Sequence, residues 1–101
     1  MKSLFVASAL LAATAAFAAP DGQAIAAKHN CLACHAVDHK IVGPAYKDVA
    51  AKYKGDANAA ARLAAKVKAG GVGVWGNIPM PAQQISDADV KIIVNWVLTS
   101  K

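Results

Sequence analysis

Apolar and polar residues follow one another along most of this chain with the spacing of α-helices. Residues 21–28 form the first predicted helix, capped by the aspartate at its start, and a second helix over residues 45–53 begins after Pro44. The apolar runs at residues 41–42 and 72–74 are too short to build a sheet. The pattern therefore predicts an all-α fold.

A third helix and a long loop follow. Asp56 is the predicted N-cap of an alanine-rich helix that runs to about Ala69. Gly70 and Gly71 end this helix, because glycine readily adopts the backbone conformations that close one. Residues 72–84 are rich in glycine and proline, so we expect an ordered loop there.

The last helix has the clearest signal. Ser86 and Asp89 have the spacing of a capping box, in which each side chain bonds to the other residue's backbone N–H. After them, Ile93, Trp96 and Val97 form an apolar stripe at helical spacing that faces the core. Trp96 is accordingly expected to have a structural role.

The first 18 residues have the composition of a secretory signal peptide. Lys2 provides a positive start, residues 4–17 are apolar and rich in alanine, and Ala16-Phe17-Ala18 offers small residues at −3 and −1. The apolar run is shorter than the roughly 20 residues that span a bilayer, which argues against a membrane anchor. We expect cleavage after Ala18, with Ala19 as the alternative, and export to the periplasm.

One small domain, residues 19–101, would remain. At roughly 80 residues an apolar core alone gives marginal stability, and a metal, disulfide or cofactor usually adds to it. The formal net charge of the whole chain is +5, from lysines that are scattered and not clustered. This distribution argues against nucleic-acid binding and favours weak, salt-sensitive attraction to an acidic partner.

The chemistry of the chain is concentrated in one short motif, Cys31-Leu32-Ala33-Cys34-His35. Two cysteines separated by two residues and followed by histidine are typical of a c-type haem attachment site. The spacing lets both thiols reach the vinyl groups on one porphyrin edge, while the histidine provides a neutral nitrogen to the iron. We therefore expect one covalently attached haem c, bound through Cys31 and Cys34, with His35 as an axial ligand.

Paired cysteines also occur in disulfide sites and in zinc sites. A thioredoxin-like disulfide site needs alternating strands and helices, which this chain lacks. A zinc site needs four nitrogen or sulfur ligands, and only His29 and His39 are left to join the motif. A module without haem therefore remains the less favoured alternative.

Met80 is the predicted second axial ligand. It stands between Pro79 and Pro81, on a stiff extended backbone far in sequence from the haem attachment motif. A methionine ligand raises the reduction potential and blocks the iron to small molecules, as an electron carrier requires. The rival ligands His29 and His39 lie too close in sequence to the motif to cross easily to the far face of the haem.

With these motifs in place, residues 19–101 resemble the small bacterial class I cytochromes c, in particular the cytochrome c-551/c-552 group. This resemblance implies four to five helices wrapped around one covalently attached haem, with the first and last helices packed together. The segments that carry it are Cys31-Leu32-Ala33-Cys34-His35, residues 41–50, Gly73-Val74-Trp75-Gly76, Ile78-Pro79-Met80-Pro81 and Asn95-Trp96-Val97-Leu98.

The resemblance also implies roles for residues around the ligands. The Pro44 carbonyl would accept a hydrogen bond from Nδ1 of His35, which orients the ring. Trp75 would donate its indole N–H to a haem propionate, and Lys66 would lie near the same group. The family often has arginine at the Lys66 position, and lysine cannot make the same forked contact.

Three further positions follow from the resemblance. Gln83 matches the position whose amide contacts the sulfur of the methionine ligand. Tyr46 and Tyr53 are expected to pack against the haem and its propionate side.

The function implied is that of a periplasmic electron carrier, not an enzyme, and a monomer that docks briefly with redox partners. A respiratory donor and a terminal reductase, such as nitrite reductase or an oxidase, are the expected partners. A ligand-binding or enzymatic haem protein is disfavoured because no acid or base set is evident for the far face. The expected docking patch comprises Leu32, Ala33, Ile41, Ile78, Pro79, Pro81 and Ala82, with Lys28, Lys40 and Lys47 around it.

Overall fold

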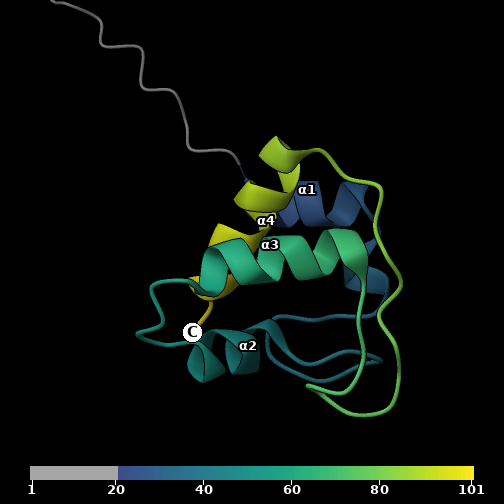
Figure 1. The fold of residues 1–101 in the computed structure, drawn as a ribbon, viewed down its shortest axis with the longest axis vertical. Coiled ribbons are helices and arrows are strands. Elements are labelled where there is room, and N and C mark those ends of the chain that lie inside the picture. The colour runs from purple at the N-terminus through teal and green to yellow at the C-terminus, as the bar shows by residue number, and fades with distance from the viewer. Residues whose placement is uncertain (1–20) are drawn as a thin grey trace, which may run out of the picture.

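Four α-helices organise the part of the chain that the structure, a computed structural model, describes: residues 21–101 (Figure 1). Within these residues no strand forms, so the predicted all-α fold is confirmed. The predicted signal peptide, residues 1–18, lies outside the described residues. The elements are α1 (Gly22–Lys28), a 3-10 helix η1 (Cys31–Ala33), α2 (Tyr46–Lys52), α3 (Ala59–Ala69) and α4 (Asp87–Leu98).

Two of the predicted helix caps are present. The Asp21 carboxylate accepts the N–H groups of Gln23 at 3.0 Å and Ala24 at 3.3 Å, which satisfies donors at the open end of α1. The Ser86 hydroxyl accepts the Asp89 N–H at 3.1 Å at the start of α4. Both helices therefore begin where the sequence predicts.

The predicted cap at Asp56 is wrong. Helix α3 begins at Ala59, and Asn58 occupies its N-cap without a side-chain hydrogen bond. The Asp56 carboxylate instead accepts the Asn58 N–H at 2.9 Å and pairs with Arg62. A short carboxylate readily bonds the backbone two residues on, so Asp56 closes the turn before the helix and does not cap it.

The predicted capping box is half formed. Asp89 does not return a bond to Ser86, because its carboxylate pairs with Nε2 of His29 at 3.0 Å. His29 lies at the C-cap of α1, 60 residues away in sequence. This pair joins the first and last helices, and a contact between such distant residues is invisible to a local sequence pattern.

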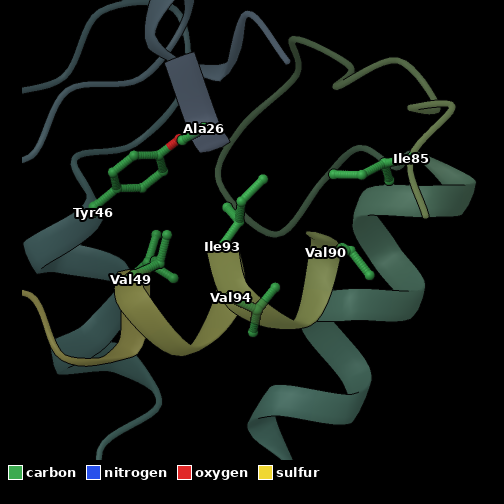
Figure 2. Close-up of a cluster of buried hydrophobic side chains, with 8 residues drawn as sticks. Ala26, Tyr46, Val49, Ile85, Val90, Ile93 and Val94 are labelled. Carbon is green, nitrogen blue, oxygen red and sulfur yellow. The ribbon is translucent and has the colours of Figure 1, made fainter. Parts of the chain in front are cut away.

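Helix α4 is the centre of the packing, since α1, α2 and α3 all contact it. Figure 2 shows Val90, Ile93 and Val94 of α4 pointing among side chains from the other elements. The buried cluster comprises Ala26, Tyr46, Val49, Ile85, Val90, Ile93, Val94 and Val97. Burial of these side chains provides the main driving force for the fold.

The close crossing of α1 and α4 depends on glycine. A Cβ placed on Gly22 would lie 2.6 Å from Cγ of Trp96, a separation that real contacts do not show. Trp96 packs against the core and meets the Tyr46 ring edge-on, with ring centroids 5.3 Å apart. The structural role expected for Trp96 is therefore confirmed, as is the packing of the terminal helices on each other.

Two long segments without regular helices, residues 34–45 and 70–86, lie beside the helices. In Figure 1 the green segment after α3 runs away from the helices and returns to the start of α4. Backbone pairing of Gly71 with Met80 closes this loop at its base, and His35 pairs with Lys40 in the other segment. Among residues 21–101, none of the helices has the length and apolar content to cross a bilayer.

Candidate haem site

A cavity of about 320 Å³ opens between these two segments and the helices. Several of its apolar side chains are unusually exposed for their size: Ile78 is 64% and Val72 58% accessible. Such exposure is costly unless something apolar covers it. The aliphatic lining side chains are Val42, Val49, Leu63, Val67, Val72, Val74, Ile78, Ile93, Val94 and Val97.

The Cys31–His35 motif forms one tight turn at the edge of this cavity. The His35 N–H donates to the Cys31 carbonyl at 3.0 Å, after Asn30 has turned the chain with a left-handed φ of 60°. Both thiols and the imidazole line the cavity. Burial raises the pKa of the Cys31 thiol, although hydrogen bonds from its own backbone and from the Tyr46 hydroxyl act against this rise.

The His35 ring is held from several sides. Its Nδ1 donates to the Pro44 carbonyl at 2.8 Å, and its face stacks on Tyr46 with ring centroids 5.0 Å apart. Gly43 lies so close that a Cβ there would be 2.8 Å from Nδ1 of His35. Because a carbonyl can only accept, Nδ1 carries the hydrogen, and Nε2 keeps a lone pair for a metal ion.

Met80 lines the same cavity from the other segment. Its N–H donates to the Gly71 carbonyl at 2.8 Å, and its own carbonyl accepts the Gly71 N–H at 3.0 Å. The thioether side chain is partly buried. The structure therefore brings together at one cavity an imidazole and a thioether that are 45 positions apart in the chain.

Trp75 and Lys66 also line the cavity. Trp75 is 39% exposed, and Nζ of Lys52 lies 5.4 Å from its ring centroid, a cation–π contact. Lys52 was missed by the sequence reasoning. Nothing in the local pattern of α2 marks it, since the contact depends on how the loop folds back onto that helix.

Gln83 lies at the cavity, but its amide is engaged with the backbone. Its Nε2 donates to the Pro81 carbonyl at 3.0 Å, and its backbone N–H donates to the Val67 carbonyl at 3.1 Å. This geometry differs from the expected contact with the Met80 sulfur. The side chain therefore braces the loop that carries Met80.

The two other histidines have carboxylate partners and do not line the cavity. His29 pairs with Asp89, and Nδ1 of His39 lies 2.8 Å from Asp38. Across residues 21–101, no group of three or more histidine, cysteine or acidic side chains could hold a metal ion. This arrangement gives no support to the zinc alternative.

Comparison with known proteins agrees with this geometry. The family model described as "Cytochrome c" matches residues 19–101. The chain belongs to the cytochrome c family. This cytochrome is 54% identical to cytochrome c-552 of Nitrosomonas europaea, over 96% of the chain and 92% of the relative. It is 51% identical to cytochrome c-551 of Pseudomonas aeruginosa, over 82% of the chain and 80% of that protein.

A solved structure shares the fold. The crystal structure of wild-type Nitrosomonas europaea cytochrome c552 superposes with a TM-score of 0.76 at 54% identity, covering 78% of this chain and 99% of that one. The resemblance to the c-551/c-552 group is thus confirmed. The cytochrome is an electron carrier and not an enzyme, and it holds one covalently attached haem c.

The residues of the cavity fit that group. Two thiols separated by two residues suit thioether bonds, the lining is mainly apolar, and the free Nε2 of His35 suits iron. Haem also accounts for the exposure of the cavity-lining side chains Val42, Val72, Val74 and Ile78. These side chains form the walls of a cofactor site.

Proposed function

We propose that His35 and Met80 are the two axial ligands of the haem iron, with thioether bonds to Cys31 and Cys34. The observation that carries this proposal is that all four side chains line one apolar cavity. The haem, when bound, supplies a reversible one-electron couple. The Pro44 carbonyl holds the His35 ring by its Nδ1–H, and the flanking prolines stiffen the backbone of Met80.

Trp75 and Lys66 are proposed to face the haem propionates. Both line the cavity, and one offers an indole N–H while the other offers an ammonium group. Lys52, beside the Trp75 ring, adds a second positive charge at this side. Gln83 is proposed to support the ligand loop through Pro81.

We further propose that residues 1–18 are removed on export and that residues 19–101 act as a monomer in the periplasm. The redox partners are a respiratory donor and a terminal reductase such as nitrite reductase or an oxidase. The composition of the first 18 residues and the extent of the family match support this proposal. The mass of the protein purified from a periplasmic fraction tests it: a chain beginning at residue 19 with one haem attached is expected.

The partners are proposed to dock at the patch predicted around Ile41 and Ile78; Ile41 is 46% exposed and does not line the haem cavity. Four aspartates are paired with basic side chains of this chain: Asp38 with His39, Asp56 with Arg62, Asp87 with Lys68 and Asp89 with His29. Among the described residues, Lys28, Lys40 and Lys47 have no carboxylate in salt-bridge range. An acidic partner suits this surface, and its reaction rate should fall with added salt.

The axial ligand assignment is tested by the absorption spectrum of the oxidised protein. A weak long-wavelength band from sulfur-to-iron ligation is expected in the wild type and should be absent in Met80→Ala. The reduced wild type should not bind carbon monoxide at neutral pH, whereas the variant should. A wild type that contains haem but lacks the band would exclude Met80 as the ligand.

A further inference from the structure

We infer that Gly70 is a positioning residue for Met80: the absence of a side chain at position 70 lets the Met80 backbone approach α3 and so sets where the Met80 sulfur lies. The inference rests on the proposed role of Met80 as an axial ligand. Gly70 also ends α3, where its φ of 75° and ψ of 179° belong to a region almost restricted to glycine. The role of Gly70 in ending α3 accounts for its backbone angles. It does not account for how closely Gly70 lies against the segment that carries Met80.

Those contacts all fall on the segment that carries Met80. A Cβ on Gly70 would lie 2.7 Å from the Met80 carbonyl oxygen and 2.7 Å from the Ala82 nitrogen. The Pro81 carbonyl carbon would be 3.1 Å away. Ordinary contacts begin at 3.4 Å. Backbone atoms cannot rotate aside as the end of a side chain can, so the whole segment would have to move outward.

The hydrogen bonds around Gly70 make this movement consequential. The Met80 oxygen that a Cβ would strike is the same atom that accepts the Gly71 N–H at 3.0 Å. The Met80 N–H returns a bond to Gly71 at 2.8 Å, and Gln83 N–H bonds to Val67 of α3 at 3.1 Å. These bonds fix the segment at Met80 and at Gln83, three residues after it. A side chain at position 70 would therefore weaken this attachment at the point where the sulfur is presented.

A small displacement should be visible in the iron–sulfur bond. Methionine is a neutral ligand, and the axial ligand is one of the means by which a protein sets a haem potential. Among residues 21–101, no hydrogen bond or aromatic contact is made by the Met80 side chain itself, so its position follows that of its backbone. Moving the backbone should lengthen the bond or break it.

The test compares Gly70→Ala with Gly55→Ala, both prepared as the haem-loaded protein. Gly55 has a φ of 81°, similar to that of Gly70, but its Cβ would meet nothing within 4 Å. Both variants impose backbone strain, and only Gly70→Ala pushes on Met80. We expect Gly70→Ala to lose most of the sulfur-to-iron band, to shift to a lower reduction potential and to bind carbon monoxide when reduced, while Gly55→Ala keeps the wild-type values.

The outcomes separate this inference from the proposed function. If the wild-type band is absent, or survives in Met80→Ala, the ligand assignment fails. If that assignment stands but Gly70→Ala keeps the band and potential of the wild type, Gly70 only ends the helix and the inference is wrong. Equal loss of the band in both glycine variants would attribute the effect to strain and would also overturn it.

Gly70→Ala could fail to accumulate with haem, and the wild type then provides the test. Hydrogen exchange of the Met80 amide, which reports its bond to Gly71, is followed together with the sulfur-to-iron band as denaturant is added. We expect protection and band to disappear together. A band that persists after the Met80 amide has lost its protection would show that the backbone pairing does not position the sulfur.

Discussion

The two walls of the haem cavity hold their ligand residues in different ways. His35 is fixed through its own side chain, by the Pro44 carbonyl at 2.8 Å and by the Tyr46 ring 5.0 Å away. Met80 is fixed through its backbone, by paired hydrogen bonds to Gly71. The wall that carries His35 therefore fixes the direction of the imidazole ring. The wall that carries Met80 fixes where its backbone lies.

This difference follows from the chemistry of the two side chains. An imidazole has a second nitrogen that can be bonded to a neighbour, so a direct contact can orient it without using the lone pair that binds metal. A thioether has no second polar atom that a neighbour could bond, and the methionine side chain has several rotatable bonds. Its position is controlled best by a rigid backbone, which Pro79 and Pro81 and the Gly71 pairing provide. Side-chain packing should thus control the position of His35. Backbone geometry should control the position of Met80.

The largest effect is expected from removing the ring that supports His35. Tyr46 is 5% exposed and touches both His35 and Trp96. Tyr46→Ala should cost about 3–5 kcal/mol of unfolding free energy in the haem-loaded protein, as large aromatic truncations in cores do. Denaturant titration measures it. Tyr46→Phe keeps the ring and serves as the control, with a loss of about 1 kcal/mol; equal losses would mean that the hydroxyl, not ring packing, supports this wall.

Crowding the His35 ring should have the next largest effect. A Cβ on Gly43 would lie 2.8 Å from Nδ1 and 2.9 Å from Nε2 of His35, so Gly43→Ala must displace the ring. We expect a loss of about 1–3 kcal/mol, typical of overpacking, and a smaller fraction of protein with covalent haem. Mass spectrometry gives that fraction. Gly55→Ala, whose Cβ meets nothing, is the control; a haem fraction in Gly43→Ala equal to that of the control contradicts the prediction.

Removing the Gln83 side chain, beside Met80, should cost much less unfolding free energy. The Gln83 amide donates to Pro81 at 3.0 Å in an exposed position, and Gln83→Ala removes this bond while the Val67 backbone bond remains. The expected loss is about 0.5 kcal/mol, at the low end for a hydrogen bond. Denaturant unfolding checks it. A loss as large as that of Tyr46→Ala would show that side chains dominate both walls.

The smallest effect is expected beyond the His35 wall, at the exposed pair of Asp38 and His39. The hydrogen bond from His39 lowers the pKa of Asp38 below its ordinary value. A lowered carboxyl pKa stabilises the fold above the ordinary pKa, and this contribution disappears as the pH falls through the folded value. In His39→Ala the pKa of Asp38 should rise toward its ordinary value, measured by NMR titration. An unchanged pKa would show that the pair does not persist in solution.

Local features of the sequence predicted much of the fold. The Asp21 and Ser86 caps are set by residues two or three positions away, and the glycines after Ala69 end α3 as expected. The predicted second helix, residues 45–53, forms as Tyr46–Lys52. The Asp56 cap failed because that carboxylate has a nearer backbone donor in Asn58. Where local alternatives compete, the sequence pattern does not decide between them.

The sequence by itself determined the haem attachment motif, the four helices and the methionine between two prolines, because each depends on residues that are neighbours in the chain. Only the tertiary structure decided that Asp89 bonds to His29, that Gly22 admits Trp96 and that Gly70 lies against Met80. These contacts join separate elements whose approach is set by the packing of whole helices around α4. A residue's partner across such an interface depends on three-dimensional distance, which a local pattern does not contain.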